Sequence, residues 1–136
     1  MLLQPKRTKF KKLRKNYLRN LIEKGSFRLR FGSIALQAIE SCRLTSRQLE
    51  ATRQCIRRHL GRKGKIWIKI FPQIPVTRKP ISTRMGKGKG SISFWCSPIK
   101  VGAVLFEICG VSLYKAEHAF IKGSYKLPIK TRILLR

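Results

Sequence analysis

Hydrophobic side chains recur at a helical period between residues 45 and 61, and this pattern predicts the clearest element of the chain. One face of this helix holds Leu49, Thr52, Ile56 and Leu60. The opposite face holds Arg47, Ala51, Arg58 and Arg62. Thr45 and Gln48 have the spacing of a capping box, and Gly61 or Gly64 is expected to end the helix. The segment therefore buries one side and presents arginine on the other.

A second helical pattern spans residues 112–127 and is more ordinary in charge. The side chains in register along it are Leu113, Ala116, Phe120 and Leu127. Ser112 is predicted as the N-cap, and Pro128 stops the helix because proline cannot continue it. Gly123 is expected to weaken the last turn.

Alternating or short apolar segments predict strands in the rest of the chain. The expected strands are "SFRLRFG" (26–32), "SIALQAIES" (33–41), "KIWIKIF" (65–71), "SISFWCS" (91–97), "GAVLFEICG" (102–110) and "IKTRILLR" (129–136). The first of them places Phe27, Leu29 and Phe31 on one face. We expect "PIKVG" to join the fourth and fifth as a hairpin. Prolines on both sides of Val76 leave room there only for a short edge strand.

The order of these elements is β, β, α, β, β, β, α, β, without a repeating βαβ unit. This order favours the α+β class, with a mostly antiparallel sheet and two packed helices. At 136 residues we expect a basic arm over residues 1–24 and a single domain over residues 25–136.

The net charge of the chain indicates the class of its binding partner. The chain has 32 Lys and Arg against 5 acids, all glutamates, which gives a formal net charge of +27. Self-repulsion on this scale opposes a compact state unless a polyanion neutralises it, so a large nucleic acid is the expected partner. The arm, in which Leu13 and Tyr17 are interleaved with cations, is expected to order against an RNA backbone. A mitochondrial targeting segment is the competing interpretation of the arm, but there is no serine before Ser26.

Catalytic and metal chemistry have little support in the sequence. The chain contains no aspartate, and neither His59 nor His118 has an obvious catalytic partner. No two of its four cysteines have zinc-knuckle spacing, and Cys55 with His59 is the one pair at ligand spacing on a helix. The longest apolar run contains Glu107 and is too short to span a bilayer. We therefore expect no enzyme activity, cofactor, metal, membrane partner or small-molecule substrate.

The segment "STRMGKGKGS" is a candidate phosphate cradle. No glycine in it is followed by the Lys-Ser or Lys-Thr of a nucleotide-binding P-loop, and it precedes a strand rather than a helix. Glycines let a backbone come close to a ligand, and the lysines between them supply charge. The residues predicted to form the cradle are Arg84, Met85, Gly86, Lys87, Gly88, Lys89 and Gly90. The alternative is a flexible hairpin tip.

Six motifs run in order along the chain: "LQPKRTKF", "RLTSRQLEA", "GKIWIKIFPQIPVTRKP", "RMGKGKG", "LFEICGV" and "KLPIKT". Together they resemble the bacterial-type ribosomal protein sixteen of the large subunit. The resemblance implies a structural protein that binds large-subunit rRNA near the peptidyl transferase centre, with neighbouring ribosomal proteins around it. It also implies that the glycine-lysine loop reaches toward tRNA. A free-standing basic RNA-binding or RNA-chaperone domain is the alternative.

The residues expected to bind rRNA lie in the arm and at the first helix. They are Lys6, Arg7, Lys9, Phe10, Lys11, Lys12, Arg14, Lys15, Arg47, Arg58, Arg62 and Lys63. The family motif begins at Leu3, which leaves no room for a cleavable presequence, and aspartate is absent. These features favour a mitochondrial, organelle-encoded protein, with the plastid or the bacterial cytoplasm as alternatives.

Overall fold

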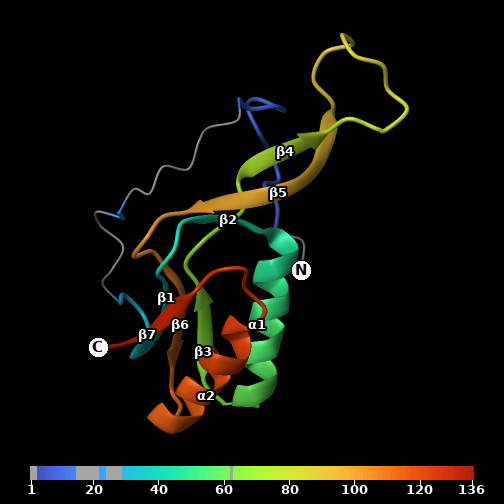
Figure 1. Ribbon diagram of the computed structural model, residues 1–136. Coiled ribbons are helices and arrows are strands. Elements are labelled where there is room, and N and C mark those ends of the chain that lie inside the picture. The colour runs from blue at the N-terminus through green and yellow to red at the C-terminus, as the bar shows by residue number, and fades with distance from the viewer. Residues whose placement is uncertain (1–2, 15–21, 24–28, 62) are drawn as a thin grey trace.

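The computed structural model describes residues 3–14, 22–23, 29–61 and 63–136. Its two helices and seven strands, all paired antiparallel within the described residues, place it in the α+β class, as predicted (Figure 1). In chain order they are β1 (Ile34–Ala38), β2 (Cys42–Thr45), α1 (Ser46–Leu60), β3 (Lys65–Ile68), β4 (Ile74–Arg78), β5 (Ser91–Ile99), β6 (Val104–Cys109), α2 (Leu113–Ser124) and β7 (Thr131–Leu135).

The strands form two antiparallel sheets. The first has the order β3-β6-β1-β7, and the second has the order β2-β5-β4. The two helices lie side by side and cover one face of the first sheet (Figure 1). The core lies between the helices and this sheet. Its largest fully buried side chains include Leu36, Ile56, Phe106 and Phe120. The second sheet extends away from this core, with β4 at its edge, where Pro75 was expected to confine it.

Two strand predictions were wrong. The predicted hairpin of "SISFWCS" with "GAVLFEICG" does not form, because β5 pairs with β2 and β4 whereas β6 pairs with β1 and β3. A tight turn at Lys100–Ala103 carries the chain from one sheet to the other. The predicted strand at 26–32 is absent over residues 29–32, which are irregular, while residues 26–28 lie outside the described residues. Strand β2 was not predicted, although its Leu44 is fully buried.

Helix α1 follows its prediction closely. Thr45 and Gln48 form the capping box, and Gly61 ends the helix with a φ of +68°. Because a side chain is strained at this φ, glycine suits the C-terminal position. The buried residues of the helix are the predicted Leu49, Thr52, Ile56 and Leu60. Burial of this stripe fixes which arginines face solvent.

Gly123 brings the two helices together. A Cβ atom at this position would lie 2.7 Å from Cγ1 of Ile56 on α1, which is closer than carbon atoms approach. The residue was predicted only to weaken its turn, but its lack of a side chain allows α2 to approach α1.

Replacement of Gly123 by alanine should therefore destabilise the fold. Alanine gains about 1 kcal/mol in helix propensity, but overpacking against buried Ile56 costs about 1–3 kcal/mol. The balance is a net loss of about 1 kcal/mol, and at most about 2 kcal/mol, in urea unfolding. Lys122→Ala, on the exposed side of the same turn, should change little. A Gly123→Ala protein as stable as the parent would contradict this account of the helix contact.

Candidate nucleic-acid interface

The N-terminal arm lies along the second sheet. Leu3 is buried and belongs to the core, so the arm is anchored at its start. From there the chain passes beside β5 and β4 (Figure 1), and an open hollow is lined jointly by Phe10 and Leu13 of the arm and by Phe71 and Trp95. The predicted cations of the arm within the described residues are all exposed: Lys6, Arg7, Lys9, Lys11, Lys12 and Arg14. Phe10 is also exposed, with the ammonium of Lys9 5.7 Å from its ring.

The glycine-lysine segment is the loop between β4 and β5, which pair directly. It extends beyond the ends of both strands, away from the helices (Figure 1). Arg84, Met85 and Lys87 are exposed in it. Gly86 and Gly88 have φ values of +89° and +71°, which glycine adopts without strain. The predicted phosphate-binding residues of this loop are therefore accessible.

Gly90 has a different role from the other two glycines. A Cβ atom here would lie 2.5 Å from the carbonyl oxygen of Arg78, so Gly90 lets the ends of β4 and β5 close together. In contrast, nothing lies within 4 Å of a Cβ at Gly86 or Gly88. At Gly90 the close approach expected of a glycine is made to the backbone of this chain itself, at Arg78. At Gly86 and Gly88 the space beside the backbone is open.

The arm and the loop are joined by two lysines. The ammonium of Lys12 donates to the carbonyl of Lys89 at 2.8 Å, and the ammonium of Lys89 donates to the carbonyl of Leu13. Lys89 therefore holds the arm against the base of the loop, whereas Lys87 remains exposed nearer the tip. The sequence had placed both lysines in one role, and the structure separates them.

The predicted residues of α1 lie in two places. Arg47, at the start of the helix, lines a hollow with Leu3 of the arm and Trp95 of β5. Arg58 and Lys63 are exposed near the opposite end of the helix. Eleven residues of helix span about 16 Å, so Arg58 does not adjoin the arm at Arg47. Predicted Lys15 and Arg62 lie outside the described residues.

Other basic residues were missed by the sequence analysis. An open hollow of about 540 Å³ is lined by arm residues together with Arg43 of β2 and Lys89 of the loop. Arg43 precedes α1 in an unpredicted strand, so no periodicity had placed it beside the arm. The exposed Arg78 at the end of β4 adds a further cation at the base of the loop.

The few carboxylates leave this charge largely uncompensated. In the described part of the chain, ion pairs join Glu23 to Lys100, Glu40 to Lys130, Glu50 to Arg53 and Glu107 to Lys69. A hydrogen bond from Arg53 is the main reason that the pKa of Glu50 falls to about 2. None of these four pairs involves a cation of the arm or the loop, so both present positive charge to an anionic partner.

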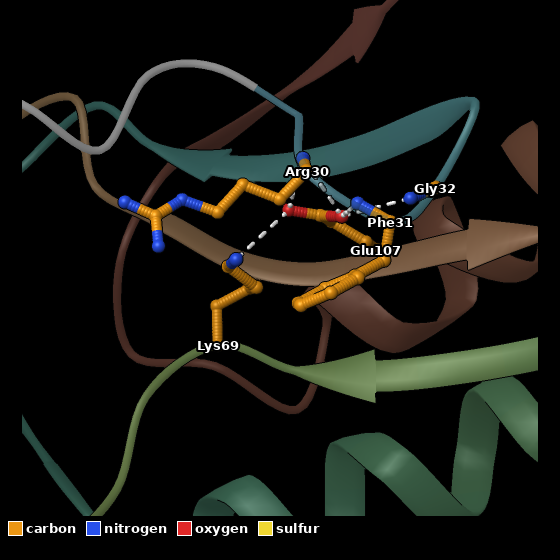
Figure 2. Close-up of polar contacts among 5 residues, drawn as sticks. All are labelled: Arg30, Phe31, Gly32, Lys69 and Glu107. Atoms are coloured by element: carbon orange, nitrogen blue, oxygen red, sulfur yellow. Dashed lines mark hydrogen bonds and ion pairs between the residues drawn. The ribbon is translucent and has the colours of Figure 1, made fainter.

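Glu107 is the most unusual carboxylate and was not singled out from the sequence. Its side chain is fully buried in β6, where it accepts backbone hydrogen bonds from Phe31 at 2.7 Å, Gly32 at 2.8 Å and Arg30 at 3.3 Å (Figure 2). The ammonium of Lys69 lies 3.4 Å away. Burial raises the pKa of Glu107, but the three backbone donors and Lys69 outweigh burial and lower it below its ordinary value of 4.5. The carboxylate is thus held in its charged form.

The histidine and cysteine side chains do not form a metal site in the described part of the chain. The sulfur of Cys55 lies 3.9 Å from Nδ1 of His59, but this nitrogen is also 2.9 Å from the carbonyl of Cys55. The rings of His59 and His118 are 5.7 Å apart, and no group of three potential ligands occurs among the described residues.

Burial raises the pKa of the Cys96 thiol, which lies inside β5. No helix within the described ranges is long and apolar enough to cross a membrane.

An α+β domain with such an excess of exposed cations is typical of proteins that bind nucleic acid. Residues 5–134 match the family model described as ribosomal protein L16p/L10e, and the chain belongs to this family. Similar proteins, each named large ribosomal subunit protein uL16, occur in Maricaulis maris, Cereibacter sphaeroides and Paracoccus denitrificans. Each is 50% identical over 135 residues, which cover 99% of this chain and 98% of the relative.

Proposed function

We propose that this protein is a structural constituent of the large ribosomal subunit that binds large-subunit rRNA and neighbouring ribosomal proteins. Family membership supports the assignment. The observation that carries it is the arm, whose cations are exposed while Leu3 and the Lys12 to Lys89 contact hold it on the second sheet. Cations held in this way release counterions from an RNA backbone and give strong, salt-dependent binding. The protein supports assembly and performs no bond chemistry.

Sedimentation of the tagged chain tests this function. We expect the protein to sediment with large subunits after a salt wash that removes nonspecifically bound cationic proteins. A protein found entirely at the top of the gradient would contradict the assignment. That outcome would favour the alternative, a free RNA-binding or RNA-chaperone domain, which should bind arbitrary RNA without a preferred site.

For the loop between β4 and β5 we propose a position near tRNA and the peptidyl transferase centre. The support is its extension beyond the sheet and the exposed Arg84 and Lys87 at positions where glycine keeps the backbone open. Lys89 is assigned a different role, because its ammonium binds the arm.

Replacement of Lys87 by alanine should weaken binding of tRNA to the assembled subunit. Loss of one phosphate contact removes a charge-assisted interaction, and we expect the dissociation constant to rise about two- to tenfold. Filter binding of labelled aminoacyl-tRNA measures this change, with Lys126→Ala, beyond the end of α2, as the control. If the Lys87→Ala protein were absent from assembled subunits, the loop would be needed for assembly, and its assignment to tRNA would be wrong.

The organisms in which the similar proteins occur bear on the cellular compartment of this one. The similar proteins come from bacteria, which agrees with the bacterial alternative and gives no support to a mitochondrial or plastid location. Our proposal is therefore limited to ribosomes of the bacterial type, in whichever compartment they translate.

A further inference from the structure

A stacked aromatic pair, of which Phe31 is exposed and Trp67 partly buried, lies on the face of the first sheet that the helices do not cover. The rings of Phe31 and Trp67 stack with centroids 5.9 Å apart and planes inclined by 22°. Phe31 remains 56% exposed. Trp67 is opposite Glu107 in the β3–β6 pairing, so both side chains lie on the face opposite Phe106 and Ile108. Phe31 and Trp67 belong to neither the arm nor the loop.

The buried carboxylate of Glu107 fixes the position of Phe31. Three successive backbone N–H groups, those of Arg30, Phe31 and Gly32, converge on it (Figure 2). Gly32 has no room for a Cβ atom, which would lie 2.7 Å from the carbonyl oxygen of Ile108. The segment is therefore clamped to β6 with the Phe31 ring held over Trp67. A ring held in one orientation before binding loses little freedom when a ligand stacks on it.

Cations surround the aromatic pair. The ammonium of Lys69 lies 4.7 Å from the centroid of the Phe31 ring and is balanced by Glu107. The Arg30 side chain extends away from this carboxylate and is exposed (Figure 2). Lys65 is exposed two residues before Trp67 and lines an open hollow of about 510 Å³ beside it. The unbalanced charge around the rings is thus positive, which suits an aromatic ligand that carries negative charge.

We propose that Phe31 and Trp67 form a stacking platform for an unpaired RNA base, with Arg30 and Lys65 binding the adjacent phosphates. This inference rests on the proposed RNA-binding function and adds a site outside the arm and the loop. Bases stack on exposed aromatic side chains irrespective of their sequence, and flanking cations hold the backbone. Glu107 acts as a positioning residue, because it touches the backbone of the platform and not the ligand.

Fluorescence of Trp67 tests the platform in the full-length chain. The chain has two tryptophans, and Trp95→Phe leaves Trp67 as the single reporter. We expect a single-stranded uridine hexanucleotide to quench this fluorescence saturably, whereas inorganic polyphosphate of equal charge should bind without quenching it. In this background, Phe31→Leu should raise the midpoint of quenching about tenfold or more. The matched control is Tyr125→Leu, which removes a ring that is 72% exposed beyond α2 and should leave the midpoint unchanged.

Three results would overturn the platform. They are equal quenching by polyphosphate, an unchanged midpoint in Phe31→Leu, and quenching by an acidic peptide but not by RNA, which would indicate a protein partner. Should Phe31→Leu fail to fold, as judged by circular dichroism, Arg30→Ala combined with Lys65→Ala replaces it, since both side chains are exposed, and should raise the midpoint. The Phe31→Leu protein should still sediment with large subunits, so failure of the platform is distinguishable from failure of the proposed function.

Discussion

Replacement of Glu107 by alanine is expected to destabilise the folded protein by about 3–5 kcal/mol. The substitution leaves the backbone N–H groups of Phe31 and Gly32 without their acceptor. It also leaves Lys69, whose side chain is only 12% exposed, without its counter-charge. Glu107→Gln should cost less, about 1–3 kcal/mol, because its amide oxygen still accepts hydrogen bonds. Urea unfolding of the isolated chain, with sulfate present to screen its charge, measures both differences.

The matched control for this experiment is Glu40→Gln. Glu40 is exposed and its carboxylate lies 4.0 Å from Lys130, so this surface pair should contribute less than about 1 kcal/mol. Equal losses of stability for the Glu40 and Glu107 variants would show that the hydrogen bonds from residues 30–32 to Glu107 contribute no more to stability than a surface ion pair does.

The contribution of Glu107 should also depend on pH. Its pKa in the folded protein is lower than its ordinary value of 4.5, so its stabilisation is fully present above that value. As the pH falls below 4.5 and through the folded pKa, the stabilisation is lost. Glu50 titrates in the same range, with a pKa of about 2. The difference in unfolding free energy between the parent and Glu107→Gln should therefore shrink on acidification, since Glu50 is present in both proteins.

The second large effect is expected in the arm. Replacing Lys6, Arg7 and Lys9 with alanine removes three exposed cations, and each phosphate contact contributes about 0.7–0.9 to the slope of log K against log salt. We expect the slope for binding to large-subunit rRNA to fall by about 2–3, which corresponds to a loss of roughly a hundredfold or more in affinity at 0.1 M salt. Filter binding over a range of salt concentrations gives this slope.

A control with the same change in net charge separates position from charge. Lys115, Lys122 and Lys126 are exposed on or just beyond α2, away from the second sheet. Their triple replacement by alanine should leave most of the slope intact. Equal slopes for the two triple variants would mean that only net charge matters, and the assignment of the arm as an rRNA-binding segment would then be wrong.

The sequence predicted α1 well because the signals of a helix come from residues close together in the chain. The second helix was predicted less well, since Leu113 of its expected buried face is 48% exposed and Leu127 lies beyond its end. The capping box of Thr45 and Gln48 and the buried face of α1 depend on residues within four positions of each other. Pairing of β5 depends instead on β2, whose residues lie about 50 positions away, so the short "PIKVG" turn falsely indicated a hairpin. Sheet membership is decided by contacts distant in sequence, which alternation along one strand does not reveal.

The aromatic platform was hidden for a related reason. Alternation placed Phe31 on one face of a strand together with Phe27 and Leu29. In the structure its backbone N–H donates to the side-chain carboxylate of Glu107, 76 residues away, rather than to a backbone carbonyl of a neighbouring strand. Glu107 itself interrupts an apolar run and gave no sign of its three donors. In the loop, composition identified the exposed Lys87 and Lys89 alike, but only the structure distinguishes the lysine that binds the arm.

A density map of the large subunit containing this chain tests the central claim most directly. The account predicts rRNA phosphates within hydrogen-bonding distance of arm cations such as Lys6, Arg7 and Lys9, with the arm on β4 and β5 as it is here. A subunit in which residues 6–14 face solvent, while rRNA contacts the chain only through α2, would contradict it.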